Sequence, residues 1–356
     1  MTRYHILIYA GYLISAIFIA FVLNVILLRF ARTLGIRSTT EPIRWSSEYK
    51  PALGGISFFL LFLLSVACYP VFFPYRFIHL DTQLLGTLGA VTLAFLMGLA
   101  DDSYNTRPLL KFSVQVLCGL ILIYTGDSIS IFNNDLINYC ITILWVVGMM
   151  NSINMLDNMD AITTIVALFI FLESLMTIIL QHNYFHVDVL IILGIIGALI
   201  GFLFFNWHPS KLFMGDTGSQ FLGMLLAIMG IKYFWNATDF HGETHISKQI
   251  LCVVLAFLIP ITDTTTVVIN RLRRKQSPFI GGKDHTTHHL SYLGLSDSQV
   301  ALAFAGISMV SMILLLVLQG SIAELHWKHS LLFIGYILIV FGTLYTITRK
   351  TKAPEK

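Results

Sequence analysis

Residues 188–206 read DVLIILGIIGALIGFLFFN, an apolar run that contains several glycines but no charged residue after Asp188. A helix needs about 20 apolar residues to cross a hydrocarbon layer of roughly 30 Å. Because this run approaches that length, and because backbone polar groups in lipid must be satisfied within the segment, it predicts a membrane-spanning helix. It is too long for a strand of a membrane barrel.

The remainder of the chain is also rich in apolar residues and poor in charged ones. Its 356 residues are 56% hydrophobic and only 12% charged, with a mean hydropathy of +0.79. So few charges could not cover the surface of a soluble protein of this length. The net charge of +3 is small and scattered, so we expect no nucleic-acid partner.

Ten further runs resemble the first one, and together they predict an all-α polytopic membrane protein. The eleven predicted spans are 5–28, 52–73, 83–100, 109–125, 138–154, 161–180, 188–206, 218–235, 249–270, 299–318 and 331–348. The N-terminal span, 5–28, has no small-residue cleavage signal after it, so we expect it to be retained as a helix. No repeat or soluble linker interrupts the spans, which predicts one domain over residues 1–356.

Basic residues predict the orientation of these spans. Of the 22 Lys and Arg residues, 17 fall on one side, at the connections that follow odd-numbered spans and in the C-terminal tail. The opposite side has only Arg3, Arg76, Lys232, Lys248 and Lys328. The positive-inside rule therefore places the N-terminus outside and the C-terminus in the cytoplasm.

Carboxylates and amides gather in the connections on the predicted cytoplasmic side. Asp101 and Asp102 end the third span, followed by Lys111. Two adjacent carboxylates on a helix point about 100° apart, so they can meet different groups. Solvation of a helix end is the alternative.

The fifth span ends in Asn154-Met-Leu-Asp157-Asn158-Met-Asp160-Ala161. Its polar residues recur every third position, which would place them along one face of a helix. Ionisable groups at such depth usually face a functional cavity or the interface. A hydrogen-bonded packing stripe is the alternative.

Two further loops contain residues suited to binding a phosphate group. In Phe213-Met-Gly215-Asp216-Thr-Gly-Ser219, glycines flank an aspartate where a helix begins, which allows close approach of an anion to free amides, although a capped turn would read the same. The last large loop holds Arg271-Leu-Arg273-Arg274-Lys275 and then Lys283-Asp284-His285-Thr-Thr-His288-His289. The basic run could be a topology anchor alone. No cysteine accompanies the histidines, so anion binding is favoured over zinc.

Together these clusters predict a magnesium-dependent phosphoryl-group enzyme. Carboxylate and amide oxygens without thiolates suit Mg²⁺, which typically binds one or two carboxylates and substrate phosphates, and Mn²⁺ accepts the same ligands. Nearby basic residues indicate a phosphorylated substrate.

At these residues the sequence resembles the polyprenyl-phosphate N-acetylhexosamine-1-phosphate transferase superfamily. The resemblance runs in order from Pro51-Ala-Leu-Gly54-Gly55 through the aspartate pair, Lys111-Phe-Ser-Val-Gln115, Asn154-Met-Leu-Asp157 and Phe213–Ser219 to His288-His289. It implies transfer of a sugar 1-phosphate from a UDP-sugar to polyprenyl (undecaprenyl) phosphate, with release of UMP. It also implies a bacterial cytoplasmic (inner) membrane location and a role in starting a cell-envelope glycan, such as lipopolysaccharide or teichoic acid.

The resemblance also implies roles for particular residues. Asn154 and Asp216 would be the magnesium ligands, and Asp101 and Asp102 the essential catalytic pair. Lys111 and the histidine loop would neutralise phosphate charge, and Phe213 with the Asp157–Asp160 turn would form the uridine pocket. The catalytic set is then Asp101, Asp102, Lys111, His288 and His289, and the substrate-binding set is Lys50, Asp157, Asp160, Asn206, Phe213, Lys283 and His285.

The chain departs from the family pattern at two places. Asp157-Asn158-Met-Asp160-Ala161 replaces Asp-Gly-x-Asp-Gly, and His285-Thr-Thr-His288-His289 replaces His-Leu-His-His. Three consecutive histidines, typical of MraY-like enzymes, are absent, which favours a WecA/TagO-like enzyme using UDP-N-acetylhexosamine, most simply UDP-GlcNAc. The alternatives are another UDP-sugar, or a secondary transporter of a phosphorylated solute. Whether the protein forms a homodimer is left open by the sequence.

Overall fold

The computed structural model describes residues 3–31, 50–74, 81–238, 243–278, 281–320 and 327–352. In these ranges the regular structure is helical, apart from one isolated β-bridge between Ala52 and Phe213. The helices are α1 (Arg3–Phe30), α2 (Gly54–Phe72), α3 (Thr82–Tyr104), α4 (Pro108–Thr125), α5 (Asp135–Leu156), α6 (Ile162–Leu180), α7 (Val187–Asn206), α8 (Gly215–Gly230), the π-helical turn η1 (Ile231–Trp235), α9 (Ile246–Ala256), α10 (Leu258–Arg273), α11 (Thr286–Tyr292), α12 (Asp297–Gly320) and α13 (Trp327–Lys350). The all-helical class is confirmed.

Fewer membrane spans qualify than the sequence predicts. Among the described residues, nine helices are long and apolar enough to cross a membrane, or ten if α9 and α10 form one bent span, against the eleven expected. The difference lies in the predicted span 218–235. There α8 has 16 residues and continues directly into the π-helical turn η1.

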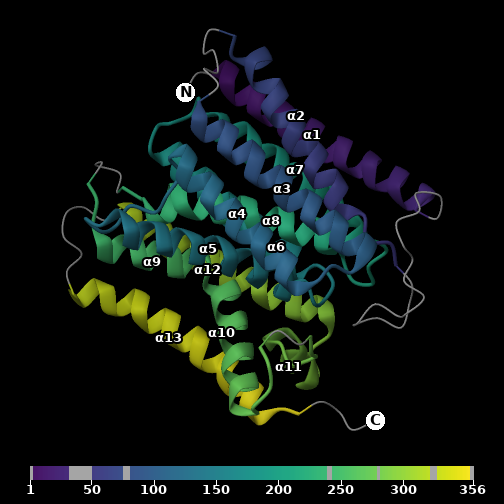
Figure 1. Ribbon diagram of the computed structural model, residues 1–356, viewed down its shortest axis with the longest axis vertical. Coiled ribbons are helices and arrows are strands. Elements are labelled where there is room, and N and C mark those ends of the chain that lie inside the picture. The colour runs from purple at the N-terminus through teal and green to yellow at the C-terminus, as the bar shows by residue number, and fades with distance from the viewer. Residues whose placement is uncertain are drawn as a thin grey trace.

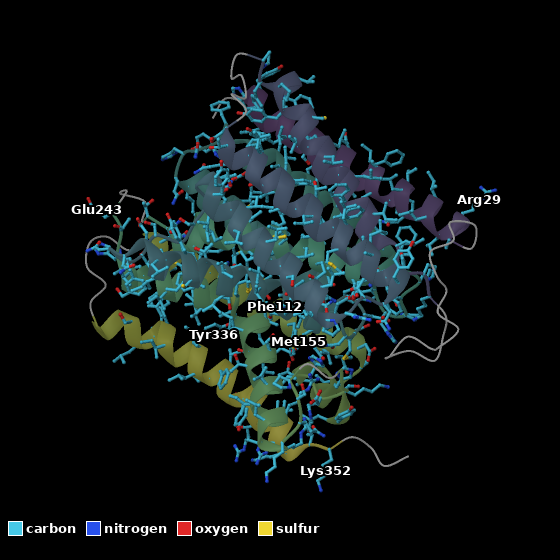
Figure 2. The ribbon with its side chains drawn as sticks, in the orientation of Figure 1. Arg29, Phe112, Met155, Glu243, Tyr336 and Lys352 are labelled. Carbon is cyan, nitrogen blue, oxygen red and sulfur yellow. The ribbon has the colours of Figure 1, made fainter. Side chains whose placement is uncertain are left out.

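The orientation predicted from basic residues stays a prediction. Figure 2 shows Arg29 and Glu243, which are expected on opposite faces of the membrane, at opposite sides of the molecule. The same prediction also rests on Arg32, Arg37, Arg44, Arg76 and Lys356, which lie outside the described residues.

The predicted span 249–270 is broken rather than continuous. Helices α9 and α10 meet at an angle of 77°. Pro260 lies in the first turn of α10. In an unbroken helix its ring would clash with the carbonyl four residues earlier, and it has no N–H to donate, so the chain must bend just before it.

Helix α8 lies in the middle of the bundle, packed against α3, α5 and α2, and its residues from Thr217 to Gly230 are all buried (Figure 1). Helices α1 and α13 lie at opposite edges of the bundle. On the α1 side, Ala16 and Ala20 pack against Gly197 and Gly201 of α7. Small residues at this spacing let two helix backbones approach closely in a membrane.

Candidate active site

The first part of the site is the tight turn from α3 to α4. Asn105 adopts a left-handed conformation (φ 50°) at the end of α3, and Pro108 begins α4. Asparagine tolerates that conformation, and proline suits the first turn of a helix because its missing N–H is not needed there. Asp101 closes the turn by accepting hydrogen bonds from the backbone N–H (3.0 Å) and the hydroxyl of Thr106.

Asp102, the second carboxylate of the pair, faces the N-terminus of α8. Its oxygens accept hydrogen bonds from the backbone N–H of Asp216 (2.9 Å) and from the N–H (2.8 Å) and hydroxyl (2.6 Å) of Thr217. Backbone N–H groups in the first turn of a helix have no partner within the helix, and a carboxylate there is favoured by the helix dipole. Asp102 therefore anchors the helix that carries Asp216.

Two glycines make this approach of α3 to α8 feasible. Gly215 has φ +71°, and a Cβ atom there would lie 2.6 Å from Oδ2 of Asp102. A Cβ on Gly98 in α3 would collide with the backbone of Asp216. Any larger residue at either position would push Asp102 away from the amides that it caps.

Lys111 joins the two halves of the site electrostatically. Its Nζ lies 3.0 Å from Oδ2 of Asp101 and 3.0 Å from Oδ2 of Asp216. One lysine from α4 therefore bridges carboxylates from α3 and α8.

Asn154, at the end of α5, binds Asp216 from the other side. Its Nδ2 donates to Oδ1 of Asp216 (2.5 Å) and to the hydroxyl of Ser219 (2.8 Å). The Asp216 side chain is 32% exposed, compared with 11% for Asp101, so Asp216 is the carboxylate more open to a ligand.

The aspartates after Asn154 lie in a turn and not along a helix face as expected. Helix α5 ends at Leu156, and Ala161, with φ 65°, precedes α6. Asn158 donates from its side chain to the carbonyl of Met155, a local bond of the kind that competes with helix continuation.

Asp157 lies near other carboxylates, including Asp216 and Asp102. Burial raises the pKa of Asp157 to about 8, and the nearby charges of Asp216 and Asp102 add to the effect. Lys111 alone does not offset this charge. The residues present therefore fit a divalent cation with oxygen ligands, because a cation near Asp216 would relieve the repulsion.

Asp160 takes part in a different cluster. It accepts hydrogen bonds from the N–H (3.0 Å) and hydroxyl (2.7 Å) of Ser210, and its Oδ2 lies 2.9 Å from Nδ1 of His208. That nitrogen is also 3.3 Å from Asp297 at the start of α12. The metal-binding atoms of these two aspartates and the histidine lie within 4.8 Å of one another. Since these atoms are already engaged with each other and with Ser210, we interpret the cluster as a clamp between three connections.

Phe213 lies beside Lys50 next to this clamp. The segment before α2 pairs with the segment before α8, with Phe213 N–H donating to the Pro51 carbonyl (2.9 Å) and Gly54 N–H to the Phe213 carbonyl (3.0 Å). The Lys50 Nζ lies 5.4 Å from the Phe213 ring centroid and 3.3 Å from the Ser210 hydroxyl. The structure thus brings together two residues expected to bind substrate.

Asn206, also expected to bind substrate, is buried, and its side-chain oxygen and nitrogen both form hydrogen bonds. Its Oδ1 accepts from the N–H of Ala161 (3.1 Å) and the hydroxyl of Thr164 (2.7 Å), and its Nδ2 donates to the carbonyl of Leu212 (3.1 Å). We interpret Asn206 as a residue that fixes the α7–α8 connection to the start of α6.

The histidine loop forms α11, which is fixed by a buried aspartate. Asp263 of α10 is 2.8 Å from Nδ1 of His285 and accepts from the N–H (2.8 Å) and hydroxyl (2.6 Å) of Thr286. The hydroxyl of Thr287 donates to Oδ1 of Asn158 (2.6 Å), which ties α11 to the turn after α5.

Three further residues of the loop, His288, His289 and Lys283, have surroundings different from those of His285. Burial lowers the pKa of His288 to about 4, with a further contribution from His285. His289 instead contacts the C-terminal end of α13, with Nδ1 2.6 Å from the Thr351 hydroxyl. No hydrogen bond or ion pair in the described ranges links His289 or Lys283 to Asp101, Asp102 or Asp216.

Several hydrogen-bond partners of the site residues do not follow from the sequence pattern. Ser219 and Thr217 were read as part of a phosphate-binding loop, yet here they hold Asn154 and Asp102. Asp263 was overlooked although an aspartate inside the predicted span 249–270 is itself a signal, because ionisable groups in spans are costly unless they are partnered.

Comparisons with known proteins identify the family. The profile described as glycosyl transferase family 4 matches residues 84–234, which carry the aspartate pair, Lys111, Asn154 and Asp216. A phospho-N-acetylmuramoyl-pentapeptide-transferase of Streptococcus agalactiae is 30% identical over 308 residues, covering 78% of this chain and 88% of that protein. The chain belongs to glycosyl transferase family 4.

Other relatives of this glycosyl transferase family 4 enzyme carry different names. A probable undecaprenyl-phosphate N-acetylglucosaminyl 1-phosphate transferase of Bacillus subtilis is 28% identical over 332 residues, covering 90% of this chain and 86% of the relative. A decaprenyl-phosphate N-acetylglucosaminephosphotransferase of Mycolicibacterium smegmatis is 26% identical over 231 residues, covering 59% and 57%. The expectation of a phosphotransferase is confirmed at the level of the family.

Proposed function

We propose that this enzyme transfers N-acetylglucosamine 1-phosphate from UDP-GlcNAc to undecaprenyl phosphate at the cytoplasmic face of a bacterial membrane, releasing UMP. The observation that carries the proposal is the convergence on Asp216: Lys111 of α4 and Asn154 of α5 both contact its carboxylate, and Asp102 of α3 caps its helix. Four helices thus place oxygen ligands and the Lys111 ammonium around one carboxylate, an arrangement suited to the positioning and charge stabilisation that phosphoryl transfer uses.

In this reaction an oxygen of the lipid phosphate attacks the sugar-linked phosphorus of the UDP-sugar. The bond from that phosphorus to the bridging oxygen breaks, and its electron pair leaves with UMP. Lys111 offsets charge between the two carboxylates and the incoming phosphates, which otherwise repel one another. Asp101 fixes the Lys111 ammonium through its 3.0 Å contact. Asp102 acts as a positioning residue, since it holds the helix that carries Asp216 in place.

Asp216 and Asn154 would hold Mg²⁺, which when bound supplies charge stabilisation for the diphosphate. The oxygen-only donor set and the presence of Asp102 and Asp157 near the Asp216 carboxylate support this assignment. Phe213 offers an aromatic face for uracil, with Lys50 beside it.

The choice of N-acetylglucosamine is a separate proposal from the reaction type. It is supported by the names of the Bacillus and Mycolicibacterium relatives. The Streptococcus relative, at comparable identity, is named for a muramoyl-pentapeptide substrate. The spacing His285-Thr-Thr-His288-His289, without three consecutive histidines, supports the N-acetylhexosamine nucleotide.

The experiment is a transfer assay with purified protein in detergent. We expect labelled UDP-GlcNAc and undecaprenyl phosphate to give labelled lipid and UMP in the presence of Mg²⁺, with partial activity in Mn²⁺ and none with Asp216→Asn. UDP-N-acetylmuramoyl-pentapeptide and UDP-GalNAc, tested in parallel, decide the sugar. Product formed only from a muramoyl nucleotide would refute the assigned substrate. Absence of any product, together with uptake of a phosphorylated solute into sealed vesicles, would favour the transporter.

A further inference from the structure

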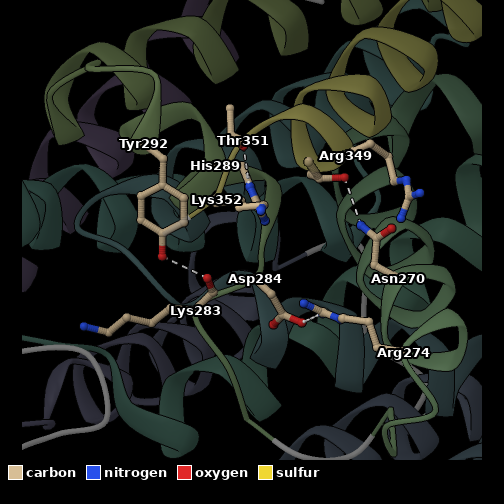
Figure 3. A pocket seen from close by; sticks show the side chains of 10 residues that line it. Asn270, Arg274, Lys283, Asp284, His289, Tyr292, Arg349, Thr351 and Lys352 are labelled. Carbon is tan, nitrogen blue, oxygen red and sulfur yellow. Dashed lines mark hydrogen bonds and ion pairs between the residues drawn. The ribbon is translucent and has the colours of Figure 1, made fainter. Parts of the chain in front are cut away.

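A polar cavity lies apart from the carboxylate cluster, between the end of α10, the segment leading into α11 and the C-terminal end of α13. It has a volume of about 230 Å³. Figure 3 shows the side chains around it, and its basic lining residues are Arg274, Lys283, His289, Arg349 and Lys352. They come from three separate parts of the chain.

The cavity has a large excess of positive charge. Asp284 is the one carboxylate in its lining, and it is already held by Arg271 (2.7 and 3.0 Å) and by Arg274 (2.6 Å). Burial would raise the pKa of Asp284, but the hydrogen bond and charge of Arg271 outweigh it and keep the pKa below its ordinary value. In the described part of the chain no ion pair engages Lys283, Arg349 or Lys352. An anion is therefore the matching ligand.

Polar uncharged groups also line the cavity. Asn270 donates from Nδ2 to the hydroxyl of Thr348 (2.9 Å), while its Oδ1 is buried and has no hydrogen-bond partner among the described residues. A buried acceptor without a partner costs about 1–3 kcal/mol. A ligand that carries a hydroxyl beside its negative charge would satisfy both features.

The position of the cavity indicates where such a ligand comes from. Helix α13 qualifies as a membrane span, and Leu331, Leu338 and Ile339 on its outer side are 56%, 63% and 68% exposed. Lipid chains would cover these side chains in a membrane, and the head groups would then lie level with the helix end. Figure 2 shows nitrogen-bearing side chains gathered near the labelled Lys352 at this end. Basic pockets between spans at the membrane surface are suited to anionic head groups.

We infer that this cavity binds the phosphate of an anionic phospholipid head group, with phosphatidylglycerol as the chemical type. Its phosphodiester would face Arg349, Lys352 and Lys283, and its glycerol hydroxyls would reach Asn270. Because α11 and α13 both contribute to the cavity, the bound head group would hold the histidine-bearing helix α11 against α13.

The test measures binding, so it does not depend on the proposed reaction. The full-length protein in an uncharged detergent is titrated with dihexanoyl-phosphatidylglycerol, dihexanoyl-phosphatidylcholine or inorganic phosphate, and its thermal unfolding is followed by tryptophan fluorescence. We expect phosphatidylglycerol to raise the unfolding temperature and phosphatidylcholine to have no effect. The double variant Arg349→Gln/Lys352→Gln should weaken phosphatidylglycerol binding roughly 30-fold, since each basic residue near the surface contributes about a fivefold effect.

Lys350→Gln is the matched control, because Lys350 lies between the two residues in sequence, is exposed and is not part of the cavity lining. It should change binding less than twofold. Equal loss in the control would show that only general surface charge is sensed and would overturn the site. Equal stabilisation by phosphatidylcholine would do the same. Binding of inorganic phosphate as tight as that of the lipid would overturn the lipid as the ligand.

Discussion

Replacing Asp102 by asparagine tests whether this carboxylate anchors α8. The two oxygens of Asp102 accept three hydrogen bonds, one from Asp216 and two from Thr217. An asparagine can keep its oxygen toward Thr217, but its NH₂ group then faces the N–H of Asp216. That donor is left without an acceptor.

The cost follows from these contacts. A buried donor without an acceptor costs about 1–3 kcal/mol. Loss of the negative charge at a helix N-terminus adds about 0.3–1 kcal/mol. We therefore expect Asp102→Asn to lower the free energy of unfolding by roughly 1.5–4 kcal/mol.

The assay is unfolding of the purified protein by a denaturing detergent in the presence of EDTA, so that no metal contributes. Asp135→Asn is the control, because Asp135 lies in the first turn of α5 and is exposed. It should cost no more than about 1 kcal/mol. If both variants unfolded at the same detergent concentration, Asp102 would not anchor α8, and a direct role in the chemistry would have to replace the positioning role.

The other predictions concern charge and the nucleotide. Asp216→Asn should lower turnover at least about 100-fold at every Mg²⁺ concentration in the transfer assay while the protein stays folded, and near-normal activity would exclude it as a metal ligand. Lys111→Met should lower the free energy of unfolding in EDTA by roughly 2 kcal/mol, less than the loss expected when a fully buried ion pair is broken. Mg²⁺ should restore part of this free energy, and no recovery would argue against a cation near Asp216. Phe213→Ala should weaken UDP-sugar binding, measured by calorimetry, and leave a residual rate at saturation; unchanged affinity would exclude a stacking role. The pKa of His288 is lowered to about 4 from 6.5, so the unfolded chain binds the proton at a higher pH than the folded protein does. The free energy of unfolding should therefore fall as the pH drops from 6.5 to 4. The His288→Gln variant, unfolded over the same pH range, should show a weaker pH dependence of this free energy.

The proximity of several candidate site residues could be predicted from the sequence, because these residues belong to short polar motifs at helix ends. The expectation that Asp101 and Asp102 would meet different groups agrees with the structure, in which Asp101 contacts Lys111 and Asp102 contacts α8. The sequence could not say which carboxylate turns toward which helix. That depends on the rotation of α3 against α8, which is set by packing at Gly98 and Gly215.

Other parts could not be predicted from local pattern. His289 and Lys283 belong to the same short loop as His285, yet they line the basic cavity, whereas His285 contacts Asp263 of α10. The bend between α9 and α10 does not follow from the hydropathy of the predicted span 249–270, although Pro260 lies within that span. In lipid, hydropathy reports that a segment is buried but gives little information about its straightness.

The contact of Lys111 with both Asp101 and Asp216 bears on how the helices assemble before any substrate binds. The chain supplies its own counterion, so newly inserted protein can assemble α3, α4 and α8 without waiting for a divalent cation. A cation held by Asp216, as proposed above, would compete with an ammonium that is already in place, which would lower the net affinity of the site for the ion. Occupancy would consequently follow the concentration of free magnesium in the cell, and substrate phosphates, by adding their own negative charge, would draw the ion in when they bind.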